Sequence, residues 1–148
     1  MMFSAIVAIF ALATAAPMPT PQSLPAIDIR APKAALHLQV ATTGPQRERG
    51  LMSVTHLPRH TGMVFVFEKD ADVYFWMKDT LIPLDMIFVA PDGTVRKVYA
   101  NVPVVKPTLP DNEIPLEGGT AKYVIELPAG EASEDGIATG SRVSGLPR

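Results

Sequence analysis

The sequence predicts an all-β domain with minor α content, built as a compact antiparallel β-sandwich or a partly closed barrel with two short helices. Three observations favour this class. Six or seven short runs alternate apolar and polar residues, the connections are rich in Pro and Gly, and no long helical period or internal repeat occurs. The 148 residues, 47% of them hydrophobic, are enough for one hydrophobic core.

The amino-terminal region predicts export. Residues 1–16 (MMFSAIVAIFALATAA) form an apolar stretch that is too short to span a bilayer and ends in small residues, as a cleaved signal peptide does. Residues 17–33 are proline-rich and predict a linker, because each proline fixes φ and removes a backbone donor. We therefore expect a single domain over 34–146, periplasmic or extracellular, whose contact with a membrane is limited to the signal segment before cleavage.

The first predicted elements are a strand and a short helix. Within 34–42, Leu36, Leu38 and Val40 alternate with less apolar residues, which is the period of a half-buried strand. Residues 43–51 open with a polar cap and a proline and carry charged side chains, which predicts a short surface helix that ends at Gly50.

Two hairpins are predicted next. The runs 63–68 and 73–78 are separated by the polar segment 69–72, which resembles a turn. The runs 85–90 and 94–100 flank Pro-Asp-Gly, where glycine supplies the positive φ of a tight turn.

The last third of the chain predicts mixed elements. Residues 103–119 are rich in Pro and Gly and predict an irregular crossing loop. We expect a strand over 122–127 (KYVIEL), a short helix over 131–135 and a final strand over 142–144.

The charge balance limits the possible partners. Fifteen acidic and thirteen basic residues give a net charge of −2, which does not create the basic field that nucleic acid requires. The chain has no cysteine, which excludes disulfides and a thiol nucleophile. His56 and His60 have a chelating spacing, but Pro58 between them disfavours a helix there, so we predict neither a metal site nor a cofactor.

The segment 75–85 (FWMKDTLIPLD) is the most distinctive in the chain. Strand alternation around it predicts a packing face and a second face that can contact a ligand. The packing face comprises Val73, Phe75 and Met77, and the second face comprises Tyr74, Trp76 and Lys78. An aromatic pair ending in a cation can stack on a sugar or a planar ligand while the ammonium meets an anion. In the alternative, Trp76 belongs to a second core layer and Lys78 pairs with a carboxylate.

Three carboxylates offer a different function. Asp85 with Asp79 or Glu126 could form the acid–base pair of a hydrolase acting on envelope carbohydrate, provided that the carboxyl groups share a cleft. An aspartate beside a turn more often accepts hydrogen bonds from backbone N–H groups. The sequence leaves open whether Glu126 pairs with Arg49 or Lys78.

A chain of spaced motifs supports a family resemblance. The motifs include residues 46–52 (QRERGLM), 62–67 (GMVFVF), 75–85, Asp92-Gly93 and 124–127 (VIEL). Over about 36–143 the sequence resembles the domain of unknown function 192 family. The resemblance implies an exported, compact β-sandwich or barrel with small helices, and no established activity.

Two positions depart from the family pattern. The family usually has Asn where Asp79 stands, and Asp where Ser141 follows Gly140. The first difference disfavours Asp79 as a catalytic acid.

These observations favour a non-catalytic binding module. Its predicted ligand is a sugar or an anion, or its partner is an envelope protein, and we assign no catalytic residue. The candidate ligand-binding residues are Tyr74, Trp76, Lys78, Thr80 and Asp85. The alternatives are the hydrolase and a structural or assembly protein of the envelope.

Overall fold

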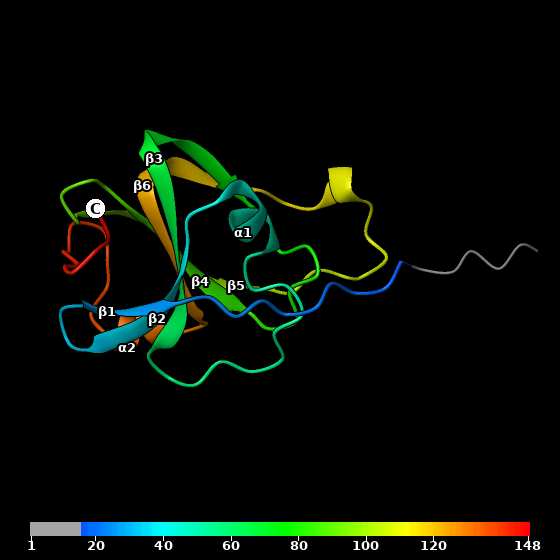
Figure 1. Ribbon diagram of the computed structural model, residues 1–148, viewed down its shortest axis with the longest axis horizontal. Helices are drawn as coiled ribbons and strands as arrows, with labels where there is room; N and C mark the ends of the chain where they lie inside the picture. Colours follow the sequence, from blue (N-terminus) through cyan, green and yellow to red (C-terminus); the bar gives the residue numbers. More distant parts are fainter. Residues whose placement is uncertain (1–15) are drawn as a thin grey trace, which may run out of the picture.

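The computed structural model describes residues 16–148, so the predicted signal peptide lies outside the described residues except for Ala16. One open six-stranded sheet, with strand order β1-β2-β3-β6-β4-β5, forms the framework of the fold (Figure 1). All neighbouring strands are antiparallel except β2 and β3, which are parallel. The predicted β-rich class with two short helices is confirmed. Within 16–148, no helix is long and apolar enough to cross a bilayer.

The elements have the following bounds. The strands are β1 (Ala26–Arg30), β2 (Ala35–Ala41), β3 (Thr61–Phe75), β4 (Leu84–Val89), β5 (Val95–Val102) and β6 (Glu117–Pro128). The helices are α1 (Gly44–Arg49), the 3₁₀ turn η1 (Asp111–Glu113) and α2 (Glu131–Glu134).

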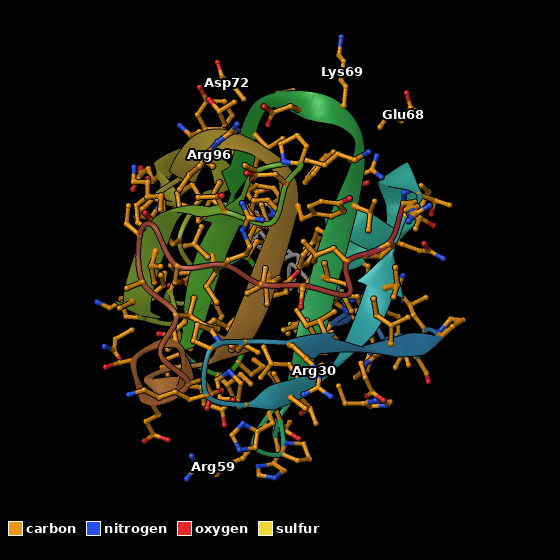
Figure 2. The ribbon with its side chains drawn as sticks, turned by 90° about the vertical axis from the view of Figure 1, so that its left-hand side faces the viewer. Arg30, Arg59, Glu68, Lys69, Asp72 and Arg96 are labelled. Carbon is orange, nitrogen blue, oxygen red and sulfur yellow. The ribbon has the colours of Figure 1, made fainter. Side chains whose placement is uncertain are left out.

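Both faces of the sheet are buried. On one face, Tyr123, Ile125 and Leu127 of β6 pack against α2 and the carboxy-terminal segment. This segment crosses the face in Figure 2. Val124 faces the opposite layer, which contains Met63, Phe65 and Phe88 together with side chains from the α1 side of the molecule. Burial on both sides explains why β4 is apolar at every position except Asp85, since every one of its residues is buried.

The linker prediction over 17–33 is wrong for its second half. β1 lies inside this range and pairs with β2, and its Ile29 is only 1% exposed. Upstream of β1, Gln22 donates to the carbonyls of Gln46 and Gly50 at 2.8 and 2.9 Å. The prolines that suggested a spacer lie outside the strand itself, where their missing N–H groups leave no gap in the sheet.

The hairpin predicted from 63–68 and 73–78 is also wrong. The first run and residues 73–75 of the second belong to β3, and they pair with different halves of β6. Between the two paired halves, four residues of β3 (67–70) lie opposite the single β6 residue Lys122, so the polar segment is a bulge rather than a turn. The Lys122 ammonium donates to the carbonyls of Phe67 and Glu68, and a bidentate ion pair with Arg96 holds Asp70. Figure 2 shows the resulting bend, from which Glu68 and Lys69 project.

The predicted hairpin around residues 91–93 is confirmed, and Gly93 has the required positive φ of 88°. The final strand predicted over 142–144 is wrong. This segment makes only isolated bridges from Ser144 to Arg30 and from Arg142 to Thr94, because it crosses the sheet instead of extending it.

We expect Gly93→Ala to lower the free energy of unfolding by about 2 kcal/mol, because the residue needs positive φ and a Cβ would lie 2.2 Å from the Val143 carbonyl oxygen. Gly140→Ala is the matched control. Gly140 has φ +90° and nothing within 4 Å of an added Cβ, so this variant should cost only the backbone strain, about 1 kcal/mol. Urea unfolding of both variants measures the difference, and equal losses would contradict the close approach.

Candidate functional site

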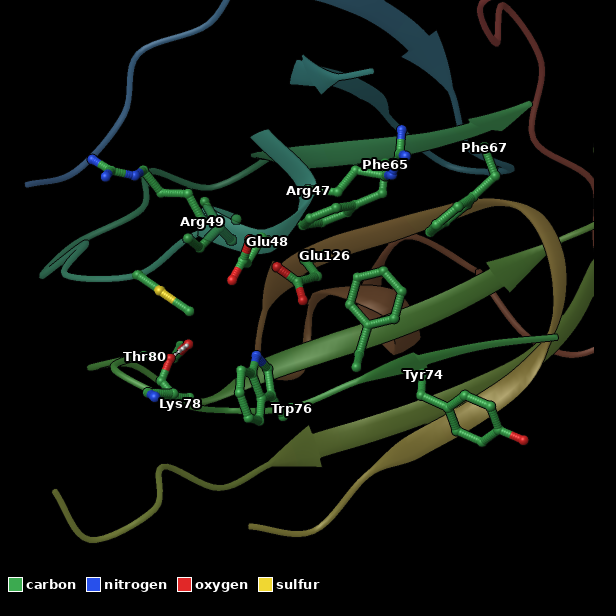
Figure 3. A pocket seen from close by; sticks show the side chains of 14 residues that line it. Arg47, Glu48, Arg49, Phe65, Phe67, Tyr74, Trp76, Lys78, Thr80 and Glu126 are labelled. Atoms are coloured by element: carbon green, nitrogen blue, oxygen red, sulfur yellow. Dashed lines mark hydrogen bonds between the residues drawn. The ribbon is translucent and has the colours of Figure 1, made fainter. Parts of the chain in front are cut away.

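A cavity of about 190 Å³ lies between α1, β3 and the segment that follows β3 (Figure 3). Aromatic rings from β3 and the following segment form its walls, α1 contributes to its mouth, and one acidic side chain from β6 reaches it from the sheet. Its lining residues are Arg47, Glu48, Arg49, Gly50, Leu51, Met52, Phe65, Phe67, Tyr74, Phe75, Trp76, Lys78, Thr80 and Glu126.

The helix α1 is fixed in place at both ends. Thr43 caps it through a capping box with Gln46, and Gly50 ends it with a positive φ of 46°. Arg47 lies 5.0 Å from the Phe67 ring centroid and donates to the Val66 carbonyl at 3.0 Å. The capping and the arginine contacts together hold three charged side chains of α1, at positions 47–49, beside the cavity.

Glu126 is the chemically unusual residue of the cavity. In β6 it lies opposite Met63 of β3 and Met86 of β4, so its side chain points to the face that carries the cavity. It is 4% exposed, and burial alone raises the pKa of its carboxyl group to about 8. Among residues 16–148, no side chain or backbone group forms a hydrogen bond or ion pair with this carboxyl group. A buried carboxyl group with a strongly raised pKa in a cavity is typical of a functional site.

The segment after β3 forms the opposite wall. Phe75 and Met77 are buried, whereas Tyr74 is 67% exposed, so the predicted alternation of faces is confirmed. The Lys78 ammonium lies 5.2 Å from the Trp76 ring centroid and forms an ion pair with Asp111. This pair with Asp111 raises the pKa of Lys78.

Four of the five predicted ligand-binding residues, Tyr74, Trp76, Lys78 and Thr80, line the cavity. Trp76 is half-buried at the cavity, as the ligand-binding interpretation of this segment predicts. Lys78 pairs with a carboxylate, as the alternative interpretation predicts. Thr80 is buried, and its hydroxyl donates to the Lys78 carbonyl at 3.3 Å.

Asp85, the fifth predicted residue, does not line this cavity. It lies opposite Leu127 of β6, on the other face of the sheet, and is 0% exposed. Its carboxylate accepts three backbone hydrogen bonds, from Asn101 at 2.8 Å, Gly130 at 3.0 Å and Ala132 at 2.8 Å. Asp85 therefore ties β5 and the start of α2 to β4, which is a structural role.

The carboxylate pairs of the hydrolase alternative are not brought together in one cleft. Asp85 and Glu126 face opposite sides of the sheet, and Asp79 lines neither the Glu126 cavity nor the groove beside Asp85. Asp79 instead adopts a positive φ of 53°, and its carbonyl accepts the Ser53 N–H at 2.8 Å. Asn and Asp tolerate this conformation better than other non-glycine residues, which explains how Asp79 fits a position where the resemblance gives Asn.

Sequence reasoning missed Glu126 and the α1 side chains as parts of the cavity. Glu126 was considered only as an ion-pair partner or as a second acid for Asp85, and the α1 side chains were not considered as part of a site. The signal for Glu126 is an acid in the middle of the apolar strand VIEL, because a strand buried on both faces has no solvated position for it.

A second polar cluster lies at the other end of β3, where His60, Glu131 and Asp135 have side-chain ligand atoms within 4.8 Å of one another. Such a set could hold a cation, but its groups already satisfy each other. Both Glu131 oxygens accept the His60 backbone N–H, at 3.1 and 3.0 Å, and the Asp135 carboxylate lies 3.2 Å from His60 Nδ1. Burial, with a contribution from Asp135, raises the pKa of Glu131. The contacts indicate a structural clamp on His60, which has a positive φ of 60°.

We expect Glu131→Ala to lower the free energy of unfolding by about 1 to 2 kcal/mol, because it leaves the His60 N–H without its acceptor. Glu134→Ala removes an exposed carboxylate of the same helix and should cost less than about 1 kcal/mol. Thermal or urea unfolding measures both variants, and equal effects would contradict the clamp.

The structure defines a small β domain with a cavity in which a buried acid lies beside aromatic rings. A family model described as "Uncharacterized ACR", the DUF192 family, matches residues 27–145, and the chain belongs to this family. The expected membership is thus confirmed, and the match begins within β1, in the range predicted as a linker.

Two crystal structures are similar to the chain. A protein of Sinorhizobium meliloti 1021, provisionally described as a transcription regulator, shares 30% identity over 84% of this chain and 97% of its own, with a TM-score of 0.74. A protein of unknown function from Novosphingobium aromaticivorans DSM 12444 shares 28% identity over 89% of this chain and 94% of its own, with a TM-score of 0.72. No curated protein matches the chain significantly.

Proposed function

We propose that this protein is an exported, non-catalytic module that binds a small polar ligand in the Glu126 cavity. The observation that carries the proposal is the Glu126 carboxyl group, which is buried, faces a cavity and has no partner among residues 16–148. Its oxygen atoms border the cavity, so a ligand that enters can form hydrogen bonds with them.

The surroundings of the carboxyl group support binding rather than catalysis. The walls are aromatic, with Phe65 and Phe75 in an edge-on contact at a centroid distance of 4.9 Å, and polar groups lie at the rim. A mostly apolar concavity with a few polar groups is the usual form of a small-molecule site. The cavity also favours this function over a structural envelope protein, which would need an exposed apolar patch instead.

Export is part of the proposal and rests on the amino-terminal sequence. The apolar stretch 1–16 has the length and the small terminal residues of a signal peptide. Mature chains from the periplasm or medium should lack it, which mass spectrometry can measure. The role in transcription described for the S. meliloti protein is not favoured for this chain, because its net charge is −2.

Titration of Trp76 fluorescence tests the proposed function. Trp76 is the sole tryptophan of the chain and lines the cavity, so its emission reports on this site. We expect saturable changes with a subset of a library of monosaccharides and small organic anions. Glu126→Leu, which removes both the donor and the acceptor, should weaken binding at least several-fold, whereas Glu68→Leu, at an exposed acid of the β3 bulge, should not. The absence of a response from every compound would contradict a ligand site here.

A further inference from the structure

The volume of the cavity limits the part of the ligand inside it to one ring. Its volume is about 190 Å³, whereas sites for drug-sized ligands have about 300 to 1,000 Å³. A cavity of about 150 Å³ is large enough to bind benzene. A single six-membered ring with its substituents therefore fits the space, and the aromatic walls provide a surface on which it can stack.

At the buried end of the cavity, Glu126 favours a neutral polar group of the ligand. Burial alone accounts for the raised pKa of Glu126, and no neighbouring charge contributes. At neutral pH the carboxyl group is therefore mainly protonated and offers one donor and one acceptor. A hydroxyl group satisfies both, whereas a ligand carboxylate placed here would be buried without a cation, which is costly.

The outer end of the site is lined by charged side chains, among them two arginines. Arg47 and Arg49 of α1 line the cavity together with a single carboxylate of the helix, Glu48. Lys78 is also at the rim, but its ion pair with Asp111 balances its charge. The two guanidinium groups donate to backbone carbonyls, Arg47 to Val66 and Arg49 to Thr20. Carbonyl groups do not neutralise these guanidinium groups. Asp79 borders the same opening beside Arg49 and Lys78, so the mouth carries charges of both signs. The Arg49 guanidinium, which bonds to the Thr20 carbonyl, has further N–H donors that can bind a ligand carboxylate.

These two ends define a polarity for the ligand. We propose that the site binds a small ring-shaped organic acid, with a ring hydroxyl at Glu126, the ring beside Trp76 and the carboxylate at the mouth near Arg49. This inference rests on the proposed function and adds the chemical class of the ligand and its orientation. Sugar acids and hydroxylated aromatic acids share this chemistry.

Two matched pairs of compounds test the class of ligand. Glucuronate and glucose differ at one ring substituent, as do 4-hydroxybenzoate and 4-hydroxybenzyl alcohol, and in each pair only the first compound carries a carboxylate. Isothermal titration at low salt should show the acid of at least one pair binding at least 10-fold more tightly than its neutral partner. The preference should shrink as salt is added, because the mouth is exposed to solvent. The pair that binds distinguishes a sugar acid from an aromatic acid.

Arg49→Gln tests the orientation. It should reduce the preference for the acid to less than about 3-fold while leaving the affinity of the neutral compound unchanged, since only the carboxylate contacts the mouth. Arg142→Gln, which removes an exposed arginine paired with Asp92, should keep the full preference. Thermal unfolding of both variants checks that each is folded.

The possible failures are distinguishable. Equal binding of acid and neutral compounds, or tighter binding of benzylamine than of benzoate, would overturn the proposed ligand class but leave a binding site. A preference that persists in Arg49→Gln would overturn the orientation. If none of these compounds binds and the Trp76 fluorescence library also gives no response, both the inference and the proposed function fail.

Discussion

Replacing Asp85 by alanine should lower the free energy of unfolding by about 3 kcal/mol or more, because each buried donor left without an acceptor costs about 1 to 3 kcal/mol. The carboxylate is fully buried and accepts the N–H groups of Asn101, Gly130 and Ala132. Removing it leaves three donors without an acceptor and opens a space between β4, β5 and α2. Urea unfolding monitored by far-UV circular dichroism measures the loss.

Asp28→Ala is the control for Asp85. Asp28 pairs with His37 at 2.7 Å but is exposed, so its removal should cost less than about 1 kcal/mol. Binding adds a second check, because Asp85 is not part of the cavity. A folded Asp85 variant that lost ligand binding while keeping the stability of the wild type would contradict the structural role of Asp85.

Glu126→Gln should stabilise the protein in alkaline solution. The pKa of Glu126 is about 8 in the folded state and 4.5 in an ordinary setting, so the native state binds the proton more tightly. Between these pH values the wild type therefore loses stability as pH rises, up to about 5 kcal/mol at about 1.4 kcal/mol per pKa unit. Glutamine stays neutral and does not show this loss.

The measurement compares the free energy of unfolding of the two proteins from pH 5 to pH 9. The variant and the wild type should have similar stability near pH 5, and the variant should be the more stable by several kcal/mol at pH 9. Glu68→Gln, at an exposed acid, should follow the wild type throughout. Parallel curves for wild type and Glu126→Gln would show that Glu126 ionises normally, in contradiction to its burial in the cavity.

Most of the fold follows from local sequence patterns. The alternation in 34–42, the capped helix at 43–51 and the glycine turn at 93 each depend on neighbouring residues, and the structure contains all three. The prediction of a hairpin over 63–78 was wrong because a polar run such as 69–72 can form either a turn or a bulge. The choice depends on Lys122 and Arg96, which are distant in sequence.

The site was predictable in part for the same reason. Alternation along 73–78 correctly separates the buried Phe75 and Met77 from the more exposed Tyr74, Trp76 and Lys78, although Phe75 also lines the cavity. The side on which Asp85 and Glu126 lie depends on the register between β4 and β6, which local patterns do not contain. The register places Asp85, which we predicted to bind a ligand, against backbone N–H groups, and it places Glu126, whose partner the sequence left open, in the cavity.

The claim that the Glu126 cavity is a ligand site is tested most directly by NMR on protein labelled with ¹³C at glutamate and ¹⁵N at tryptophan. Addition of 4-hydroxybenzoate or glucuronate should shift both the Glu126 carboxyl carbon and the Trp76 indole N–H, with one dissociation constant describing both signals. Shifts confined to surface glutamates, or no shift at either residue with both compounds and their neutral partners, would contradict a ligand site at Glu126.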